Sequence, residues 1–328
     1  MARLGKARRG KAWQGKDFMT KLVISLATRG RPQQLLDTIQ KDVATFSQPN
    51  TVLMVQADEE DRPTVMMLLN MALDKRVQVL VAPREDTIAA KWNRALVEPA
   101  DLYMIKGDDD PLTGKDVDSK LLEAAKAFPD GLGMVYGHYA NLSFPGVMCV
   151  TAGVTERFQC IMPEHFPYWF CDHWMDDLAR MIGRISFADV RTDQSQAKPT
   201  QECREPFWWA TWFDAAAVLR YAIADNLMSV IKDDPFHKKM NKNNWPWIDM
   251  RSRMINDGVR GNARLLEWGA GQPLSLKDER YQRVKEKAIA RVPEMLTLME
   301  NKAEAAKYAE ILNPSPTIAA LPRAIGAI

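Results

Sequence analysis

The chain has 328 residues and 46% apolar content, which is ordinary for a soluble globular protein with one large domain or two modest ones. Its 44 Lys and Arg residues nearly cancel its 42 Asp and Glu residues. This balance excludes the strongly basic overall charge of a protein whose main role is to coat nucleic acid. No run approaches the roughly 18 to 20 consecutive apolar residues of a membrane span, so we expect a soluble protein.

The charged and sulfur-containing residues add two expectations. Residues 1–16 carry six Lys or Arg and no acidic residue, which predicts a flexible basic arm over residues 1–20 rather than a signal peptide. The cysteines show no C-x-x-C spacing and predict buried thiols instead of a zinc site. We therefore expect a reducing compartment, the cytoplasm of a bacterium or of a virus-infected host. The four cysteines are Cys149, Cys160, Cys171 and Cys203.

Between residues 21 and 128, apolar strand-like runs alternate with helical patterns. Strands are predicted at 21–27, 51–57, 77–82 and 102–106, and helices from Pro32, from Arg62, from Asp86 or Thr87, and over 117–128. Strands that are apolar throughout and separated by helices of about three turns indicate a parallel sheet covered on both faces. The predicted fold class is therefore α/β.

From residue 131 the pattern changes. Short strands are predicted at 133–139, 146–151 and 158–162, followed by a helix at 172–182, a strand at 185–190, a loop at 191–206 and a helix at 211–231. Residues 233–249 are predicted to be irregular, and 277–311 helical with a break near Pro293. This pattern divides the chain into a basic arm (1–20), a first half (21–130), a β-rich second half (131–276) and a C-terminal helical extension (277–328).

Parallel sheets bind ligands at the carboxyl ends of their strands, which brings residues 27–31, 57–61, 83–86 and 107–110 around one crevice. The last segment contains three consecutive aspartates, whose mutual repulsion predicts a positively charged partner. Asp108 and Asp110 alternate in an extended segment and can reach the same side, where Mg²⁺ or Mn²⁺ takes carboxylates together with substrate phosphates. A turn with a helix cap explains the same cluster equally well on spacing alone. Neither a P-loop nor a G-x-G-x-x-G motif is present.

Four segments resemble one known family. SLATRGRP (25–32), VQADEED (55–61), PREDTIAAKWNRAL (83–96) and ADLYMIKGDDD (100–110) are similar, in order and spacing, to the nucleotide-binding half of GT-A-fold glycosyltransferases. The family is the large inverting one that also contains polysaccharide synthases, and the resemblance covers residues 21–190. It implies a GT-A, Rossmann-like fold with a mostly parallel sheet flanked by helices. The sequence pattern adds the β-rich acceptor half and the C-terminal helical extension.

The resemblance also implies roles for particular residues. The end of the first strand lies beside the nucleoside in this family, the acidic residue after the second strand lies at the base or ribose, and a D-x-D motif holds Mn²⁺ or Mg²⁺ on the diphosphate. A basic residue and an asparagine follow the third strand. In chain order the matching residues are Thr28, Arg29 and Arg31, then Asp58, then Lys91 and Asn93, then Asp108 with Asp110.

Inverting transfer also needs a general base that takes the proton of the acceptor hydroxyl. The resemblance places this base at the N-terminus of a helix after the β-rich segment, where Asp172, Asp176 and Asp177 are the candidates. The family's Glu-Asp dipeptide is absent here. We choose Asp172, with Asp176 on the same helical face at i, i+4. Aspartates that only complement a helix dipole are the alternative explanation.

Histidines and tryptophans supply weaker candidates. His165, His173 and His237 could each add an imidazole to a metal, and His237 is the best placed because it follows the catalytic half. A lone histidine is more often a hydrogen-bonded or surface residue. The tryptophans could stack on a sugar or base, but we expect at least half of them in the core. They are Trp208, Trp209, Trp212, Trp245 and Trp247.

The sequence thus predicts a metal-dependent inverting glycosyltransferase that uses a nucleotide-diphospho-sugar, which we expect to be a UDP-sugar. The basic arm and the Lys-rich segment 232–242 suit a polyanionic acceptor. Candidate acceptors are a hydroxymethylated base in viral (bacteriophage) DNA, flipped out of its stack, and a surface glycan. The alternatives are a non-catalytic nucleotide-sugar or nucleic-acid binding protein of the same fold, and a metal-dependent nucleotidyltransferase.

Overall fold

The computed structural model describes residues 20–138, 146–167, 170–193, 195, 205–231, 242–260 and 278–312. Its centre is a seven-stranded sheet with the strand order β3-β2-β1-β4-β7-β6-β8. The strands are β1 (Leu22–Ala27), β2 (Val52–Asp58), β3 (Val77–Ala82), β4 (Leu102–Lys106), β6 (Met134–Tyr136), β7 (Met148–Thr151) and β8 (Ile185–Phe187). The first four run parallel, β7 is antiparallel to β4 and β6, and β6 is parallel to β8. The predicted α/β class with a mostly parallel sheet is confirmed.

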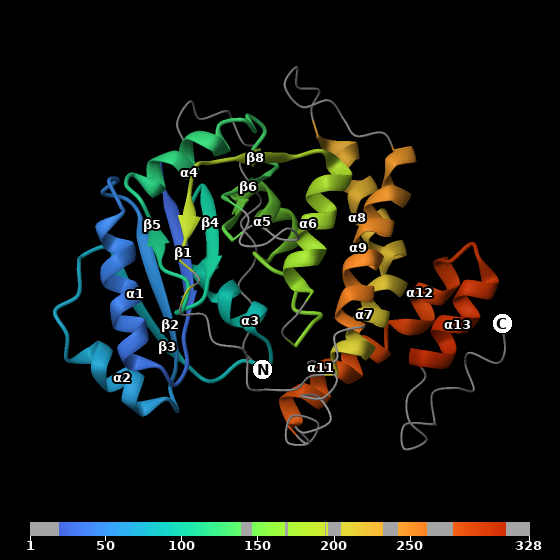
Figure 1. The fold of residues 1–328 in the computed structure, drawn as a ribbon, viewed down its shortest axis with the longest axis horizontal. Helices are drawn as coiled ribbons and strands as arrows, with labels where there is room; N and C mark the ends of the chain where they lie inside the picture. The colour runs from blue at the N-terminus through green and yellow to red at the C-terminus, as the bar shows by residue number, and fades with distance from the viewer. Residues whose placement is uncertain are drawn as a thin grey trace.

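Helices cover both faces of this sheet. The crossover helices of the first half are α1 (Pro32–Ala44), α2 (Arg62–Leu69), α3 (Ile88–Asn93) and α4 (Val117–Ala125). Thr87, one of the two predicted start signals, caps α3 by accepting the N–H of Ala90 on its hydroxyl. Figure 1 shows α1 on one side of the sheet and α6 on the other. Successive residues of β1 point to these two faces, so Leu22 and Ile24 pack in one hydrophobic cluster and Val23 in the other.

The second half is largely helical among the described residues. It contains α5 (Ala152–Phe158), α6 (Cys171–Ile182), α7 (Pro206–Ala215), α8 (Ala217–Val230) and α9 (Trp245–Arg260). The C-terminal helices are α11 (Glu279–Ile289), α12 (Val292–Leu298) and α13 (Lys302–Leu312). Short elements complete the fold: η1 (Arg94–Val97), η2 (Lys242–Asn244), and the paired strands β5 (Leu112–Thr113) and β9 (Arg191–Thr192). In Figure 1 the helices α8, α9, α12 and α13 lie beyond α6, away from the sheet, whereas α11 lies below α6.

Three predictions for this half need correction. Residues 158–162 form the end of α5 and a turn instead of a strand, because Asn93 supplies the acceptor for the N–H groups of Ile161 and Met162. The predicted helix 211–231 is two helices, α7 and α8. The region predicted to be irregular, 233–249, ends inside α9, whose buried residues recur at helical spacing at Trp245, Ile248, Ser252 and Asn256.

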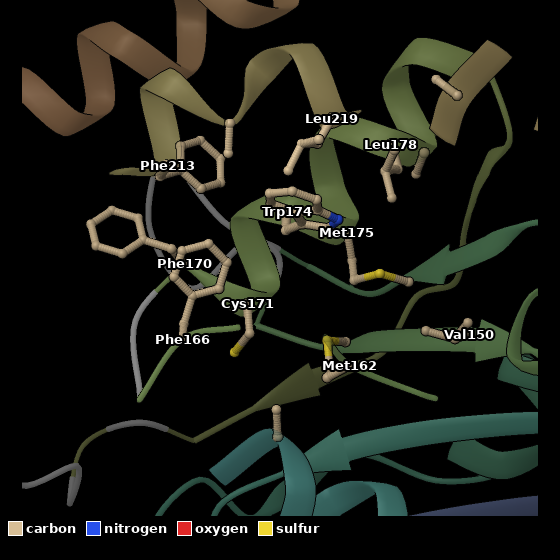
Figure 2. Close-up of a cluster of buried hydrophobic side chains, with 14 of the residues drawn as sticks. Val150, Met162, Phe166, Phe170, Cys171, Trp174, Met175, Leu178, Phe213 and Leu219 are labelled. Carbon is tan, nitrogen blue, oxygen red and sulfur yellow. The ribbon is translucent and has the colours of Figure 1, made fainter. Parts of the chain in front are cut away.

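The larger hydrophobic cluster joins α6 to the sheet and to the later helices. Figure 2 shows Cys171, Trp174, Met175 and Leu178 of α6 among side chains from the preceding segment, the sheet and the helices α7 and α8. Buried residues of α11, α12 and α13, including Met295, belong to the same cluster. The C-terminal extension therefore shares one core with the second half. Within the described ranges, no helix is both long enough and apolar enough to cross a membrane.

Candidate nucleotide-sugar site

The aspartate-rich segment after β4 is held in place by α1. Lys106, the last residue of β4, forms a fully buried ion pair with Asp42 at 2.6 Å, and the other Asp42 oxygen accepts the N–H of Leu112 at 2.7 Å. Burial raises the pKa of Asp42, and Lys106 opposes this increase. One helix side chain thus ties both ends of the segment 107–111. Thr38, one turn earlier, donates its hydroxyl to the carbonyl oxygen of Asp108 at 2.8 Å.

The carboxylate of Asp108 is the centre of the predicted site. It is fully buried, and its two oxygens contact residues from the end of β1 and the start of α1. The hydroxyl of Thr28 donates to Oδ2 at 2.6 Å, while the guanidinium of Arg31 lies 2.5 Å from Oδ1. Arg31 also binds Asp109 at 2.8 Å. Arg31 is therefore the positive partner of two of the three aspartates.

Lys91 extends this network to β2. Its ammonium donates to the carbonyl oxygen of Thr28 at 2.6 Å and lies 2.8 Å from the carboxylate of Asp58. Burial lowers the pKa of Lys91, and the contact with Asp58 opposes that effect. Thr28, Arg31, Asp58, Lys91 and Asp108 thus form one connected group at the carboxyl ends of β1, β2 and β4, as the strand-end rule leads us to expect.

Asp110 carries the feature that best fits a cation. Its Oδ1 atom is buried and has no hydrogen-bond partner in the part of the chain that the structure describes. Burial raises the pKa of Asp110 to about 7, against the attraction of Lys106. Among the described residues, no three His, Cys, Asp or Glu side chains converge as a metal cage. A Mg²⁺ site of the nucleotide-binding kind takes only one or two protein carboxylates, which is compatible with the predicted pair Asp108 and Asp110.

The two other predicted donor residues, Arg29 and Asn93, have different surroundings. Arg29 is exposed. Asn93 uses its side-chain oxygen to accept the N–H groups of Ile161 and Met162 at 2.8 and 2.9 Å. Its amide donates to the Met162 carbonyl at 2.8 Å and to Glu164 at 2.9 Å. Asn93 thus connects α3 to the segment that leads into α6.

The three candidate bases stand on α6, which in Figure 1 begins at the end of the molecule where α3 lies. The side chain of Asp172, in the first turn, is 44% exposed, and its carboxylate lies 3.1 Å from Nδ1 of His173. Burial favours a raised pKa, but His173 and the backbone hydrogen bonds of this first turn outweigh it and leave the pKa of Asp172 below its usual value. Asp172 is thus ionised at neutral pH and reaches solvent.

Asp176 and Asp177 are buried, and side chains from α6 itself, β6, α8 and α9 contact them. Asp176 accepts the hydroxyl of Tyr136 at 3.0 Å and pairs with Arg180 and Arg251 at 2.9 and 3.0 Å. Asp177 accepts the hydroxyl of Ser252 at 2.6 Å and pairs with Arg220 at 3.2 Å. Burial raises the pKa of Asp177 to about 6. These contacts hold α6 against β6, α8 and α9.

The histidine and tryptophan candidates divide between core and surface. His165 packs between the rings of Phe166 and Trp174, and Arg291 donates to its Nε2 at 3.2 Å. His237 lies outside the described residues. Of the five tryptophans, Trp209, Trp212 and Trp245 are buried, which confirms the expectation for at least half, and Trp247 is 66% exposed. Cys149 and Cys171 are buried thiols, as predicted.

The sequence did not reveal that α11 reaches the same edge of the sheet. Arg283 pairs with Asp86, in the segment between β3 and α3, at 2.5 Å, and Arg280 lies 3.8 Å from Glu60, which follows β2. These pairs join residues that are 197 and 220 positions apart, and no spacing in the sequence signals them. The Asp42 contact was detectable in principle, because Thr38 and Asp42 fall on the buried stripe of α1 with Leu35 and Ile39.

Comparisons with known proteins add similarities of fold. No protein-family model and no curated protein matches the chain. Among solved structures, the chain is similar to residues 1–349 of S. aureus TarS at 11% identity, over 89% of this chain and 87% of that one, with a TM-score of 0.48. It is also similar to the mannosyltransferase PcManGT from Pyrobaculum calidifontis in complex with GDP-Man and Mn²⁺, at 13% identity over 88% and 87%, with a TM-score of 0.44.

Proposed function

We propose that the chain is a glycosyltransferase that binds a nucleotide-diphospho-sugar at the carboxyl edge of β1, β2 and β4. One observation carries this proposal: five residues that the sequence resemblance selects, from four separate segments, form one contact network. They are Thr28, Arg31, Asp58, Lys91 and Asp108. The network surrounds the aspartates with two cationic side chains, Arg31 and Lys91, at an edge where α/β sheets hold ligands. A UDP-sugar is the donor that we propose.

Asp108 and Asp110 would hold Mn²⁺ or Mg²⁺, which supplies positive charge where the leaving diphosphate develops negative charge. The orphaned Oδ1 of Asp110 supports this assignment. The chain's own contribution is to fix the geometry of the segment 107–111. Asp42 ties its two ends and Thr38 holds its backbone, so the carboxylates keep their positions when a donor binds.

We assign the general base to Asp172. A base must be ionised and accessible to the acceptor hydroxyl; the lowered pKa of Asp172 and the partial exposure of its carboxylate support this assignment. Asp176 is saturated by Tyr136 and two arginines in the interior, so we propose that it positions α6. In an inverting transfer, Asp172 would take the proton of the acceptor hydroxyl as that oxygen attacks the sugar from the face opposite the diphosphate.

The polyanionic acceptor remains a prediction. It rests on residues 1–16 and on the segment 232–242, of which the structure describes Lys242 alone. A hydroxymethylated DNA base requires activity that decreases with salt and DNA affinity that decreases when residues 1–16 are deleted. Transfer to an uncharged surface glycan with neither dependence would exclude the DNA acceptor.

The substitution Asp172→Asn tests the enzyme assignment. The variant should lose transfer by at least about a hundredfold, the lower range for a general base. It should bind the donor as the wild type does. Asp37→Asn, on the exposed face of α1, is the matched control and should keep full activity. A binding protein would be unaffected by the change, and release of pyrophosphate in place of a nucleoside diphosphate would identify a nucleotidyltransferase.

A further inference from the structure

A second cavity lies at the opposite end of α6 from Asp172. Its volume is about 520 Å³, within the range of small-ligand pockets. The lining comes from α6, β8, η2 and the first turns of α9, and includes Arg180, Ile185, Asn244, Trp247, Ile248 and Arg251. The turn that closes α6 follows Asp172 by eleven residues, which is about 16 Å along a helix. The cavity is therefore separate from the base, and none of its lining residues belongs to the aspartate-rich segment.

The chemistry of the lining is that of a site for anions. Arg180 and Arg251 both bind the carboxylate of Asp176, which lies buried behind them, so their guanidinium groups are held in place. Each is about one-third exposed, at 26% and 31%. None of the described residues that line the cavity is acidic. Two oriented guanidinium groups match the oxygens of a phosphate.

The lining also offers a flat face beside these arginines. Trp247 is 66% exposed although its neighbours on α9, Trp245 and Ile248, are buried. An exposed indole that lines a cavity is a stacking surface for a planar ring, and stacking on it is tolerant of base identity. Asn244 adds an amide that can donate to or accept from the edge of such a ring.

The arrangement points to a nucleotide unit, with its phosphate on Arg180 and Arg251 and its base on Trp247; we propose that this cavity is a second nucleotide-binding site. The unit can come from a free mononucleotide or from a single-stranded nucleic acid. The site does not depend on the proposed glycosyl transfer, since it shares no residue with the donor network.

The test measures binding of fluorescein-labelled octathymidylate and of UMP to the full chain, in EDTA and without a nucleotide-sugar. Trp247→Ala should weaken binding about fivefold or more, since stacking contributes about 1–3 kcal/mol per base and 1.4 kcal/mol is tenfold. Arg251→Lys keeps the positive charge but loses the planar guanidinium with its paired N–H donors, so it should also weaken binding. Met254→Ala is the matched control: its side chain is 67% exposed on the same helix, outside the cavity lining, and its affinity should equal that of the wild type.

The two probes distinguish the two possible ligands, a free mononucleotide and a single-stranded nucleic acid. Tighter binding of the octanucleotide than of UMP, with the same dependence on Trp247, assigns the site to a nucleic-acid strand, and equal affinities assign it to a free nucleotide. The proposal is overturned if neither probe binds, or if both variants bind as the wild type does. It is equally overturned if a neutral oligosaccharide binds with a dependence on Trp247 and none on Arg251. Thermal melting of each variant checks that the fold is intact.

Discussion

Three aspartates within six residues of α6 have different chemistry because their surroundings differ. Asp172 lies in the first turn, partly exposed, with its pKa lowered by His173 against the effect of burial. Asp176 and Asp177 face the interior, where arginines and hydroxyl groups occupy them. The sequence shows all three at the start of a helix and cannot show these partners, since Tyr136, Arg220 and Arg251 come from other elements. Residue type limited the candidates for the general base to these three aspartates, and their tertiary contacts distinguish among them.

His165 gives a prediction about stability and pH. Burial, together with the charge of Arg291, lowers the pKa of His165 to about 4, whereas a histidine in the unfolded chain titrates near 6.5. Between these values the unfolded chain binds the proton and the folded chain does not, so the free energy of unfolding falls as the pH falls from 6.5 toward 4. Above pH 6.5 His165 is neutral in both the folded and the unfolded chain, so it causes no loss in the free energy of unfolding there.

His165→Gln keeps a neutral hydrogen-bond acceptor and removes the titration. Its free energy of unfolding should therefore fall less than that of the wild type over this range, by at most about 3 kcal/mol at 1.36 kcal/mol per pKa unit. Urea denaturation at pH 6.5, 5.5 and 4.5 measures the difference between the two slopes. Equal slopes for the wild type and the variant would show that His165 takes up its proton in the folded state.

At the scale of elements, Asn93 shows how the two halves of the fold are joined. Its side chain makes four hydrogen bonds to the segment 161–164, which leads into α6. The sequence resemblance assigns Asn93 to the donor, and that assignment remains a prediction. The structure gives Asn93 a structural role as well. Residues 158–162 do not form a strand, and Asn93 supplies hydrogen bonds to their backbone that a neighbouring strand would otherwise supply.

Asn93→Ala should lower the free energy of unfolding by about 2–4 kcal/mol, because the N–H groups of Ile161 and Met162 lose their acceptor at about 1–3 kcal/mol each. Asn70→Ala is the control. Asn70 is exposed and makes one side-chain hydrogen bond, to Met66, so the change should cost less than about 0.5 kcal/mol. Equilibrium urea unfolding compares the two variants, and similar small losses would contradict the structural role of Asn93.

Elements with a strong period were predictable, and elements held by distant side chains were not. The strands β1 to β4 lie within one residue of their predicted bounds because each is a continuous apolar run. The run at 158–162 is just as apolar, yet it ends a helix, since Gln159 adopts a left-handed conformation and Asn93 satisfies the backbone beyond it. The start of α9 was not predicted, because its composition, with tryptophans among polar residues, is more typical of a loop.

For the whole molecule, the strand-end rule for parallel sheets predicted where the site lies, and the family resemblance predicted which residues form it. Parallel β1, β2 and β4 place their carboxyl ends at one edge, and five of the predicted donor residues meet there. The C-terminal helices could not be placed by the same reasoning, because Arg283 reaches Asp86 from a helix without a recognisable motif. Those helices belong to the core that supports α6, so the donor edge, the base and the second cavity rest on one framework.

The most direct measurement is calorimetric titration of UDP-sugars, other nucleotide-sugars and free nucleoside diphosphates, with and without Mn²⁺. The wild type is compared with the double variant Asp108→Asn, Asp110→Asn. We choose asparagine because it keeps the shape of both side chains and an oxygen that can accept from Thr28. The protein should bind one nucleoside diphosphate family in a Mn²⁺-dependent manner, and the folded variant should lose that dependence. Binding of no donor, or metal-dependent binding that the double variant retains, would contradict the proposed site.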